Sequence, residues 1–186
     1  DHKSQHREFT CHTGWYKGKH VSALSTGIGT DNLDITINEL DALFNIDLEK
    51  REDKAEHTSL NMVRIGTCGI LQAEIPVHSY ILSAHAYGLD NIAHFYDVPF
   101  SAFETEMNDL IDKHLGLPAK LNPYFVSADE NMVSKLRSDK TFEGITVTSS
   151  GFYAPQGRKL RLNLATSDLN EKLGDFNQKN LKVNNF

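Results

Sequence analysis

Cysteine, long apolar runs and basic clusters are all scarce in this sequence. Its 186 residues include only two cysteines, Cys11 and Cys68. These are too few for a disulfide framework, so we expect a reducing, cytoplasmic environment. No apolar stretch reaches the roughly 18 residues that a membrane-spanning helix needs. The formal net charge is −6 and no long basic run occurs, so we expect no nucleic-acid partner and no membrane partner.

The rest of the composition is that of an ordinary globular protein, with 39% apolar and 24% charged residues. The length fits one domain that spans residues 1–186. The sequence starts at Asp1 rather than at an initiator methionine, and residues 182–186 read as a strand that has just begun. We therefore expect a single domain that is incomplete at both ends.

The first half of the chain predicts strands followed by glycine turns. Residues 21–24 form an apolar run before the turn S-T-G-I-G, and apolar side chains over 33–44 then recur at helical spacing, with Thr30 or Asp31 as N-cap. Residues 47–59 are charged and predict a solvated excursion. Further strands are expected at residues 60–65, before the turn G-T-C-G, and at 77–86.

The second half predicts more helices. Ser101 and Glu104 have the spacing of a capping box before an apolar stripe, and a short helix is expected at residues 129–137. Residues 144–148 predict a strand, and a last helix is expected with Ser167 or Asp168 as its N-cap. Strands that alternate with helices indicate a layered α/β domain.

Two glycine turns follow predicted strands, where ligands bind in α/β sheets. Neither turn fits the dinucleotide fingerprint or the Walker loop. Arg64 lies in the predicted strand before the second turn, where burial is costly unless the guanidinium meets an anion or a carboxylate. An ion pair with Asp or Glu would satisfy it. The Thr67 hydroxyl and the backbone amides beside it favour phosphate instead, which suits a planar guanidinium.

The segment F-Y-A-P-Q-G-R at residues 152–158 offers donors and acceptors together. Gln156 supplies one acceptor and two donors, and Arg158 supplies a fork of donors. Together they match a flat heterocycle with adjacent C=O and N–H groups, on which Phe152 could stack. The alternative is a Pro-Gly loop with exposed polar side chains. The nine histidines show no metal-ligand spacing, so we expect no metal.

The chain resembles the uridine phosphorylases of the nucleoside phosphorylase family. The similarity spans nearly the whole sequence and is strongest at four motifs in the family's order: H-R-E-F at residues 6–9, S-T-G-I-G at 25–29, R-I-G-T-C-G at 64–69 and F-Y-A-P-Q-G-R at 152–158. The resemblance implies an α/β fold, a three-layer α/β/α sandwich with a central mixed sheet.

The resemblance also implies roles for these residues. Arg64 and Thr67 would hold phosphate, with Thr67 near the ribose, and Arg7 would reach the phosphate of a neighbouring subunit. A homo-oligomer follows, either a dimer or a hexamer of dimers.

The base would be bound by a second set of residues in the family pattern. Phe152 would pack on uracil, and Gln156 and Arg158 would hydrogen-bond it. Cys68 and Gly69 would line the pocket through their backbone. The residues expected to act in catalysis are Arg158, Gln156 and Arg64.

Three departures from the family pattern bear on the site. The early phosphate loop would precede Asp1, and the acidic segment that binds the ribose hydroxyls would follow Phe186. Bacterial relatives place a monovalent cation near the positions of Glu8 and Ile28, but Asn32 replaces the serine expected beside them, which argues against an ion here. No cofactor is expected, since phosphate is a substrate.

The resemblance therefore predicts phosphorolysis of uridine or a related pyrimidine nucleoside to uracil and ribose 1-phosphate, in nucleoside salvage or catabolism. A purine nucleoside phosphorylase or a nucleosidase of the same family is the first alternative, although Gln156 and Arg158 favour a pyrimidine. A non-catalytic relative that only binds nucleosides is the alternative from another class.

Overall fold

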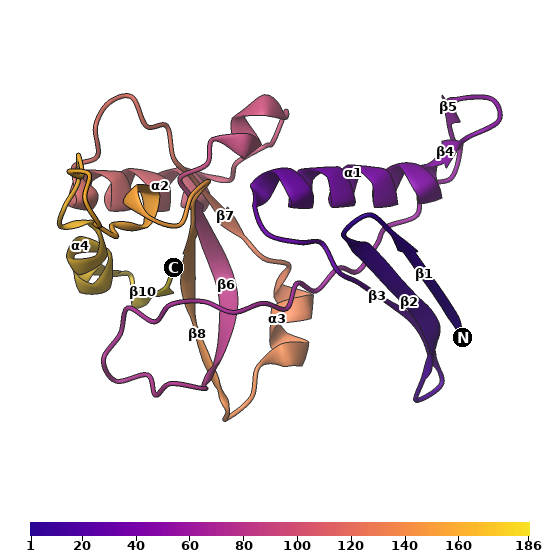
Figure 1. The fold of residues 1–186 in the computed structure, drawn as a ribbon, viewed down its shortest axis with the longest axis horizontal. Helices are drawn as coiled ribbons and strands as arrows, with labels where there is room; N and C mark the ends of the chain where they lie inside the picture. The colour runs from indigo at the N-terminus through magenta and orange to yellow at the C-terminus, as the bar shows by residue number, and fades with distance from the viewer. The chain divides into compact units, whose positions relative to one another are not determined.

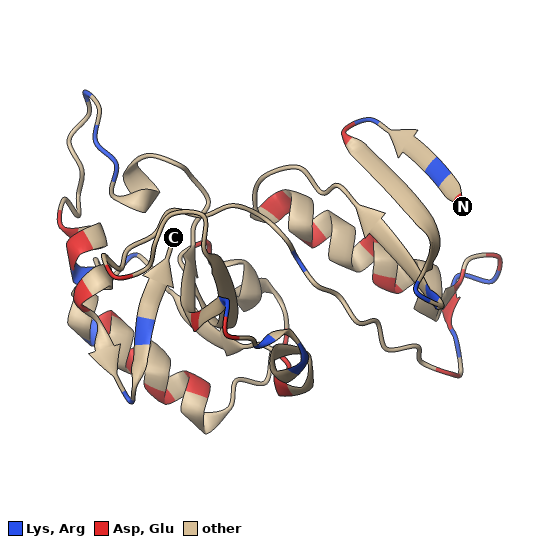
Figure 2. Cartoon of the chain, turned by 90° about the horizontal axis from the view of Figure 1, so that it is seen from below, with Lys and Arg blue, Asp and Glu red and all other residues tan.

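The computed structural model describes all residues, 1–186, and divides them into two compact units, Asp1–Ile65 and Gly66–Phe186. Each unit is described by itself (Figure 1). No helix has both the length and the apolar character needed to span a membrane. Lys and Arg alternate with Asp and Glu along the ribbon of both units (Figure 2).

The first unit is a three-stranded antiparallel sheet followed by a helix and a small hairpin. Its elements are β1 (His2–His6), β2 (Phe9–Tyr16), β3 (Lys19–Leu24), α1 (Thr30–Asn45), β4 (Ile46–Asp47) and β5 (Glu52–Asp53). The sheet order is β1-β2-β3. Arg7 and Lys17 have positive φ values of 53° and 47° in the two hairpin turns, a conformation typical of the tight turns that join antiparallel strands.

The predicted strand at residues 21–24 and the predicted helix at 33–44 are confirmed as β3 and α1. The predicted N-cap is wrong. The N-cap position is taken by Gly29, and no side chain caps the helix. The backbone at Gly29 has a φ of 109°, which glycine tolerates. The charged segment 47–59 is exposed, as expected, and contains the β4–β5 hairpin.

The strand predicted at residues 60–65 is also wrong, since no strand is formed between Asp53 and Tyr80. The segment has the composition of a strand, but no other segment of the protein pairs with it. The backbone N–H and C=O groups of an unpaired strand must hydrogen-bond to water instead. Arg64 is consequently exposed. Because the guanidinium is exposed, it does not need a phosphate or a carboxylate to offset a cost of burial. This removes one of the two grounds for predicting that Arg64 binds phosphate.

The second unit has a five-stranded mixed sheet at its centre. Its elements are β6 (Tyr80–Gly88), η1 (Ile92–Phe95), α2 (Ala102–Leu115), β7 (Tyr124–Ser127), α3 (Glu130–Leu136), β8 (Thr141–Thr148), η2 (Ala154–Gln156), α4 (Leu169–Asp175), β9 (Asn177–Gln178) and β10 (Leu181–Asn185). The strand order is β7-β6-β8-β10-β9. The pairs β6–β8 and β8–β10 are parallel, whereas the two edge strands are antiparallel. The predicted α/β class with a central mixed sheet is confirmed.

The core of this unit lies between the sheet and helices α2 and α4. Met107, Ile111 and Leu115 recur every four residues along α2 and are fully buried. They pack in one cluster with Leu169, Leu173 and Phe176 from the α4 region and with strand residues such as Ile145 and Val183. This burial holds β6, β8 and β10 in place, so their carboxyl ends and the loops beyond them have a firm base.

The capping box predicted for α2 is present and also ties the helix to β7. The Ser101 hydroxyl accepts from the Glu104 amide at 3.2 Å, and the Ser101 amide donates to the Glu104 carboxylate at 2.9 Å. The other carboxylate oxygen accepts from the Ser127 amide at 2.7 Å. Burial raises the pKa of Glu104, but the bonds from Ser101 and Ser127 outweigh burial and hold that pKa below its ordinary value of 4.5.

Replacing Glu104 by alanine is expected to lower the free energy of unfolding by about 1–2 kcal/mol at pH 7, because one cap and one bond to β7 are lost. Chemical denaturation measures this, with Asp109→Ala on the exposed side of α2 as control. Since the folded-state pKa is depressed, the carboxylate stabilises the fold above pH 4.5 and this contribution disappears as the pH falls through the folded-state pKa. A difference between Glu104→Ala and the wild type that did not shrink in acid would contradict this role.

Candidate functional site

The residues predicted to form a site are divided between the two units. Arg7, Glu8, Ile28 and Arg64 belong to Asp1–Ile65, whereas the turn at residues 66–69 and the segment 152–158 belong to Gly66–Phe186. The geometry of residues 66–69 and 152–158 can therefore be described within the unit Gly66–Phe186.

The turn at residues 66–69 is attached to the end of β10 by backbone hydrogen bonds. The Gly69 amide donates to the Phe186 carbonyl at 3.0 Å, and the Phe186 amide donates back to the Gly69 carbonyl at 2.9 Å. The Leu71 amide donates to the Asn184 carbonyl at 2.9 Å, and Ile70 forms an antiparallel bridge with Asn185. The backbone at Cys68 and Gly69 is thus fixed beside the carboxyl end of β10.

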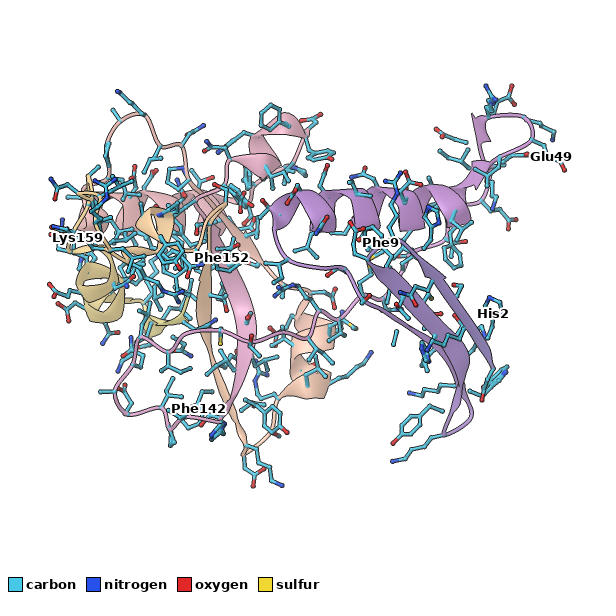
Figure 3. All side chains as sticks on the ribbon, viewed as in Figure 1. His2, Phe9, Glu49, Phe142, Phe152 and Lys159 are labelled. Atoms are coloured by element: carbon cyan, nitrogen blue, oxygen red, sulfur yellow. The ribbon has the colours of Figure 1, made fainter.

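The segment 152–158 follows β8 and folds into the short 3-10 helix η2. The amides of Gln156 and Arg158 both donate to the Tyr153 carbonyl, at 2.9 and 2.8 Å. Gly157 ends the turn with φ 67°, and the Arg158 side chain folds back so that Nη1 donates to the Phe152 carbonyl at 3.4 Å. Figure 3 labels Phe152 on this loop, and its side chain is 54% exposed.

These two segments, distant in the sequence, meet at the Arg158 guanidinium. Its Nη2 lies 3.6 Å from the position that a β-carbon on Gly69 would occupy, and the Phe186 carbonyl oxygen lies 3.9 Å from the same point. Gly69 and Arg158, which the resemblance assigns to one base-binding pocket, are therefore neighbours within one unit. Within their own units, neither Arg158 nor Arg64 forms an ion pair with a carboxylate, so both guanidinium groups keep donors for a ligand.

Gly157 is required by the shape of this turn. A β-carbon there would lie 3.1 Å from the Asn170 side chain, in addition to the positive φ. Replacing Gly157 by alanine is expected to lower the free energy of unfolding by about 1–2 kcal/mol, the cost of a left-handed conformation for an L-residue. Thermal denaturation measures this, with Gly116→Ala as a control that has the same backbone conformation but open space around the added carbon. A smaller loss at Gly157 than at Gly116 would contradict the contact with Asn170.

Cys68 and Thr67 lie at the surface of the turn. Both cysteines of the chain are free, and Cys68 is exposed. Burial of part of its side chain raises the pKa of the Cys68 thiol, and a hydrogen bond from the Asn185 side chain acts in the opposite direction. Sequence reasoning did not single out Asn185. The available signal was an amide side chain within the strand predicted to begin at residues 182–186, because an amide is costly to bury unless it is hydrogen-bonded.

Two hollows of the surface lie elsewhere. One of about 410 Å³ lies on the three-stranded sheet, between β1, β2 and β3. Another of about 110 Å³ lies between α2 and β7 and is lined by His94, Phe100 and Tyr124 among others. Neither includes a residue of segments 66–69 or 152–158. We place the candidate site at Gly69 and Arg158 because of the sequence motifs to which they belong and the hydrogen-bond donors of Arg158. The placement does not rest on a surface hollow.

The resemblance places a monovalent cation near Glu8 and Ile28, and in the structure the backbone carbonyls of both residues accept hydrogen bonds. The Ile28 carbonyl accepts a hydrogen bond from the Asn32 side chain at 3.0 Å, and this donor competes with a cation for the oxygen. The Glu8 carbonyl accepts from the Ser25 hydroxyl at 3.1 Å. Asn32, at the position where the resemblance predicts a serine, thus donates to one of these two oxygens.

Comparison with known protein families gives one match that covers most of the chain. The family model described as the phosphorylase superfamily matches residues 1–174. A uridine phosphorylase of Thermococcus kodakarensis is 28% identical over 155 residues, which are 71% of this chain and 51% of the relative. A DeoD-type purine nucleoside phosphorylase of Thermoanaerobacter sp. (strain X514) is 38% identical over 71 residues, which are 38% of this chain and 25% of the relative. The chain thus spans between a quarter and about half of the length of these two relatives.

Among solved structures, a nucleoside phosphorylase of Trypanosoma brucei, reported to show uridine phosphorylase activity, is similar to the whole chain. It has a TM-score of 0.87 and 27% identity, and the match covers 100% of this chain and 68% of that one. A uridine phosphorylase of the oomycete Phytophthora capsici has a TM-score of 0.54 and 19% identity, covering 95% of this chain and 59% of that one. This second match concerns the fold alone.

Proposed function

Because the chain belongs to the phosphorylase superfamily, we propose that it cleaves uridine, or a related pyrimidine nucleoside, with inorganic phosphate to give uracil and ribose 1-phosphate. The observation that carries this proposal is the position of the Arg158 guanidinium beside Gly69. It supports a single pocket made by the turn at residues 66–69 and the segment 152–158. The names of the relatives from Thermococcus kodakarensis and Trypanosoma brucei support the substrate.

In this proposal, Gln156 and Arg158 recognise the base. Uracil presents carbonyl oxygens next to N–H groups, which a glutamine amide and a guanidinium fork can match in one plane. Phe152 covers one face of the ring, and the backbone of Cys68 and Gly69 lines the edge. When the glycosidic bond breaks, negative charge grows on the base, and the donors of Arg158 and Gln156 stabilise that charge.

The phosphate end of the proposed reaction is held by Arg64 and Thr67. The ribosyl group passes through an oxocarbenium-like state, and phosphate attacks its anomeric carbon, so no covalent enzyme nucleophile is needed. Holding phosphate in attack geometry can lower such barriers by about 7–11 kcal/mol. Arg7 would reach the phosphate of a neighbouring copy of the chain, so the active form would be a homo-oligomer. No cofactor takes part.

A purine substrate is the second candidate, because DeoD-type purine nucleoside phosphorylases also match. The Bacillus subtilis enzyme of that name is 27% identical over 170 residues, 84% of this chain and 66% of the relative. The pair Gln156 and Arg158 favours a pyrimidine, since its donors and acceptors suit the uracil edge.

A substrate panel tests the proposal on the full-length protein. Uridine, thymidine, inosine and adenosine are each incubated with and without phosphate, and release of free base is measured. Phosphate-dependent release from uridine is the expected result. Phosphate-dependent release from inosine or adenosine alone would establish the purine activity, and release without phosphate would establish a nucleosidase. Calorimetric binding of uridine with no base release would identify a non-catalytic binding protein.

A further inference from the structure

Gln72 is a buried amide side chain that lies three residues after Gly69 of the candidate site. It is 7% exposed. Its Nε2 donates to the Gly174 carbonyl of α4 at 3.0 Å and to the Val183 carbonyl of β10 at 2.7 Å. A primary amide nitrogen carries two hydrogens, so both donors of Gln72 are used. One side chain thus fastens the segment just after the candidate turn to a helix and to a strand.

The backbone at Leu71 is held against the same two elements. The Leu71 amide donates to the Asn184 carbonyl of β10 at 2.9 Å. The Leu71 carbonyl faces α4, because a β-carbon on Gly174 would lie 3.2 Å from its oxygen. That separation is tighter than an ordinary van der Waals contact, so only a glycine at this point of α4 leaves the segment its present position. The end of the helix and the segment are therefore closely fitted.

Helix α4 reaches the other half of the candidate site with its opposite end. The side chain of Asn170, in the first turn of α4, lies 3.1 Å from the position that a β-carbon on Gly157 would occupy, and Gly157 immediately precedes Arg158. The apolar face of α4 is buried in the core of the unit. The helix is therefore a firm base that contacts the segment 152–158 through its first turn and the segment of Gln72 through its last turn.

We infer that Gln72 is a positioning residue for the nucleobase: its two hydrogen bonds fix where Gly69 lies relative to Arg158, because both halves of the pocket are built on α4. This inference rests on the proposed function. In this proposal Gln72 itself touches neither the base nor phosphate. A turn that moved away from α4 would let the base tilt from the Arg158 donors, so the nucleoside would bind less tightly.

The first test replaces Gln72 by methionine in the full-length protein, which keeps the length of the side chain and removes both donors. The kcat/KM for the nucleoside is expected to fall about 3- to 10-fold through a higher KM, the effect of losing ordinary hydrogen bonds. Hydrogen exchange of the Gly69 and Leu71 amides, which donate to carbonyls at the end of the sheet, is expected to speed up.

Tyr124→Phe is the matched control for this variant. It also removes a hydrogen bond of a buried side chain, from the Tyr124 hydroxyl to Asp90 at 2.8 Å, but on β7, at the edge of the sheet away from β10. Both variants are expected to lose thermal stability. Tyr124→Phe should keep the nucleoside KM and the exchange rates of the Gly69 and Leu71 amides, because a loss of stability alone does not change the kinetics of the folded molecules.

A double-mutant comparison separates positioning from stability. If Gln72 acts by placing Gly69 relative to Arg158, its removal matters less once the guanidinium is gone. Gln72→Met is therefore expected to change the nucleoside kcat/KM by less than about twofold in an Arg158→Ala background, against the loss of about 3- to 10-fold in the wild type. Equal factors in the two backgrounds would overturn the positioning role.

A further variant leaves Gln72 unchanged and decides the question should Gln72→Met fail to fold. Gly174→Ala adds a β-carbon 3.2 Å from the Leu71 carbonyl oxygen and so pushes the segment away from α4, while alanine favours a helix more than glycine does. It is expected to raise the nucleoside KM in the same direction without a large loss of stability. An unchanged nucleoside KM in Gly174→Ala would contradict the inference.

The outcomes separate this inference from the proposed function. A wild-type protein that releases no base overturns the proposed function, and the inference with it. An active wild type in which Gln72→Met and Tyr124→Phe shift the nucleoside KM equally overturns only the positioning role of Gln72.

Discussion

Replacing Arg158 by alanine is expected to lower kcat for uridine phosphorolysis by about 10²–10³, the usual effect of removing one preorganised donor to developing charge. The guanidinium lies beside Gly69 and forms no ion pair with a carboxylate of its own unit, so its donors are available to the base oxygens. Because charge on uracil develops mainly in the transition state, kcat and kcat/KM should fall together. Initial rates of uracil release over a range of uridine and phosphate concentrations give both values.

A better leaving group provides a sharper test of this role. 5-Fluorouracil is a stronger acid than uracil and needs less help to depart with negative charge, so the defect of Arg158→Ala should be smaller with 5-fluorouridine. Arg158→Lys keeps the charge but loses the planar fork and should recover only part of the rate. Lys159→Ala removes the next cation on the same loop and should leave the rate near that of the wild type. Equal defects with the two nucleosides would contradict stabilisation of the leaving group.

Local signals in the sequence predicted the helices of the second unit well. The capping box before α2 satisfies backbone donors that any helix start exposes, and Asp129 caps α3 by accepting from the Met132 amide. The stripe of Leu169, Leu173 and Phe176 is buried. These features depend on a few neighbouring residues, so a sequence can reveal them without knowledge of the fold.

Features that depend on distant partners were less predictable. Residues 60–65 have the composition of a strand, yet no other strand pairs with them. Strand formation depends on pairing and packing context as much as on composition. The neighbours of Arg64 cannot be read from its sequence context for the same reason. Strand pairing depends on segments that are far apart in the sequence, whereas a helix cap depends on a few adjacent residues.

In the candidate site, too, features within a sequence motif were predictable and contacts between distant segments were not. Gly69 and Arg158 belong to motifs that carry the resemblance, and the structure brings the two residues together within one unit. Asn185, which is buried next to this turn, was missed because its side-chain oxygen accepts from Thr146, a residue of a separate strand. A single asparagine among several in residues 177–185 gives no local sign of such contacts.

Replacing Arg64 by alanine is expected to raise the KM for phosphate about 10- to 100-fold and to lower kcat as well, while the KM for uridine changes little. Hydrogen bonds to charged groups contribute about 1.5–3 kcal/mol each, and an arginine fork can place two on one phosphate. Arg64 is exposed and lies three residues before Thr67, the other proposed phosphate ligand. Initial rates at varied phosphate and saturating uridine measure the effect, and substituting arsenate for phosphate should show the same loss, since both anions are tetrahedral. Arg51→Ala, an exposed arginine in the charged segment of the same unit, is the matched control and should leave the phosphate KM unchanged. If the two variants had equal phosphate KM values, Arg64 would contribute only general positive charge, and the phosphate site would have to be sought elsewhere in the assembly.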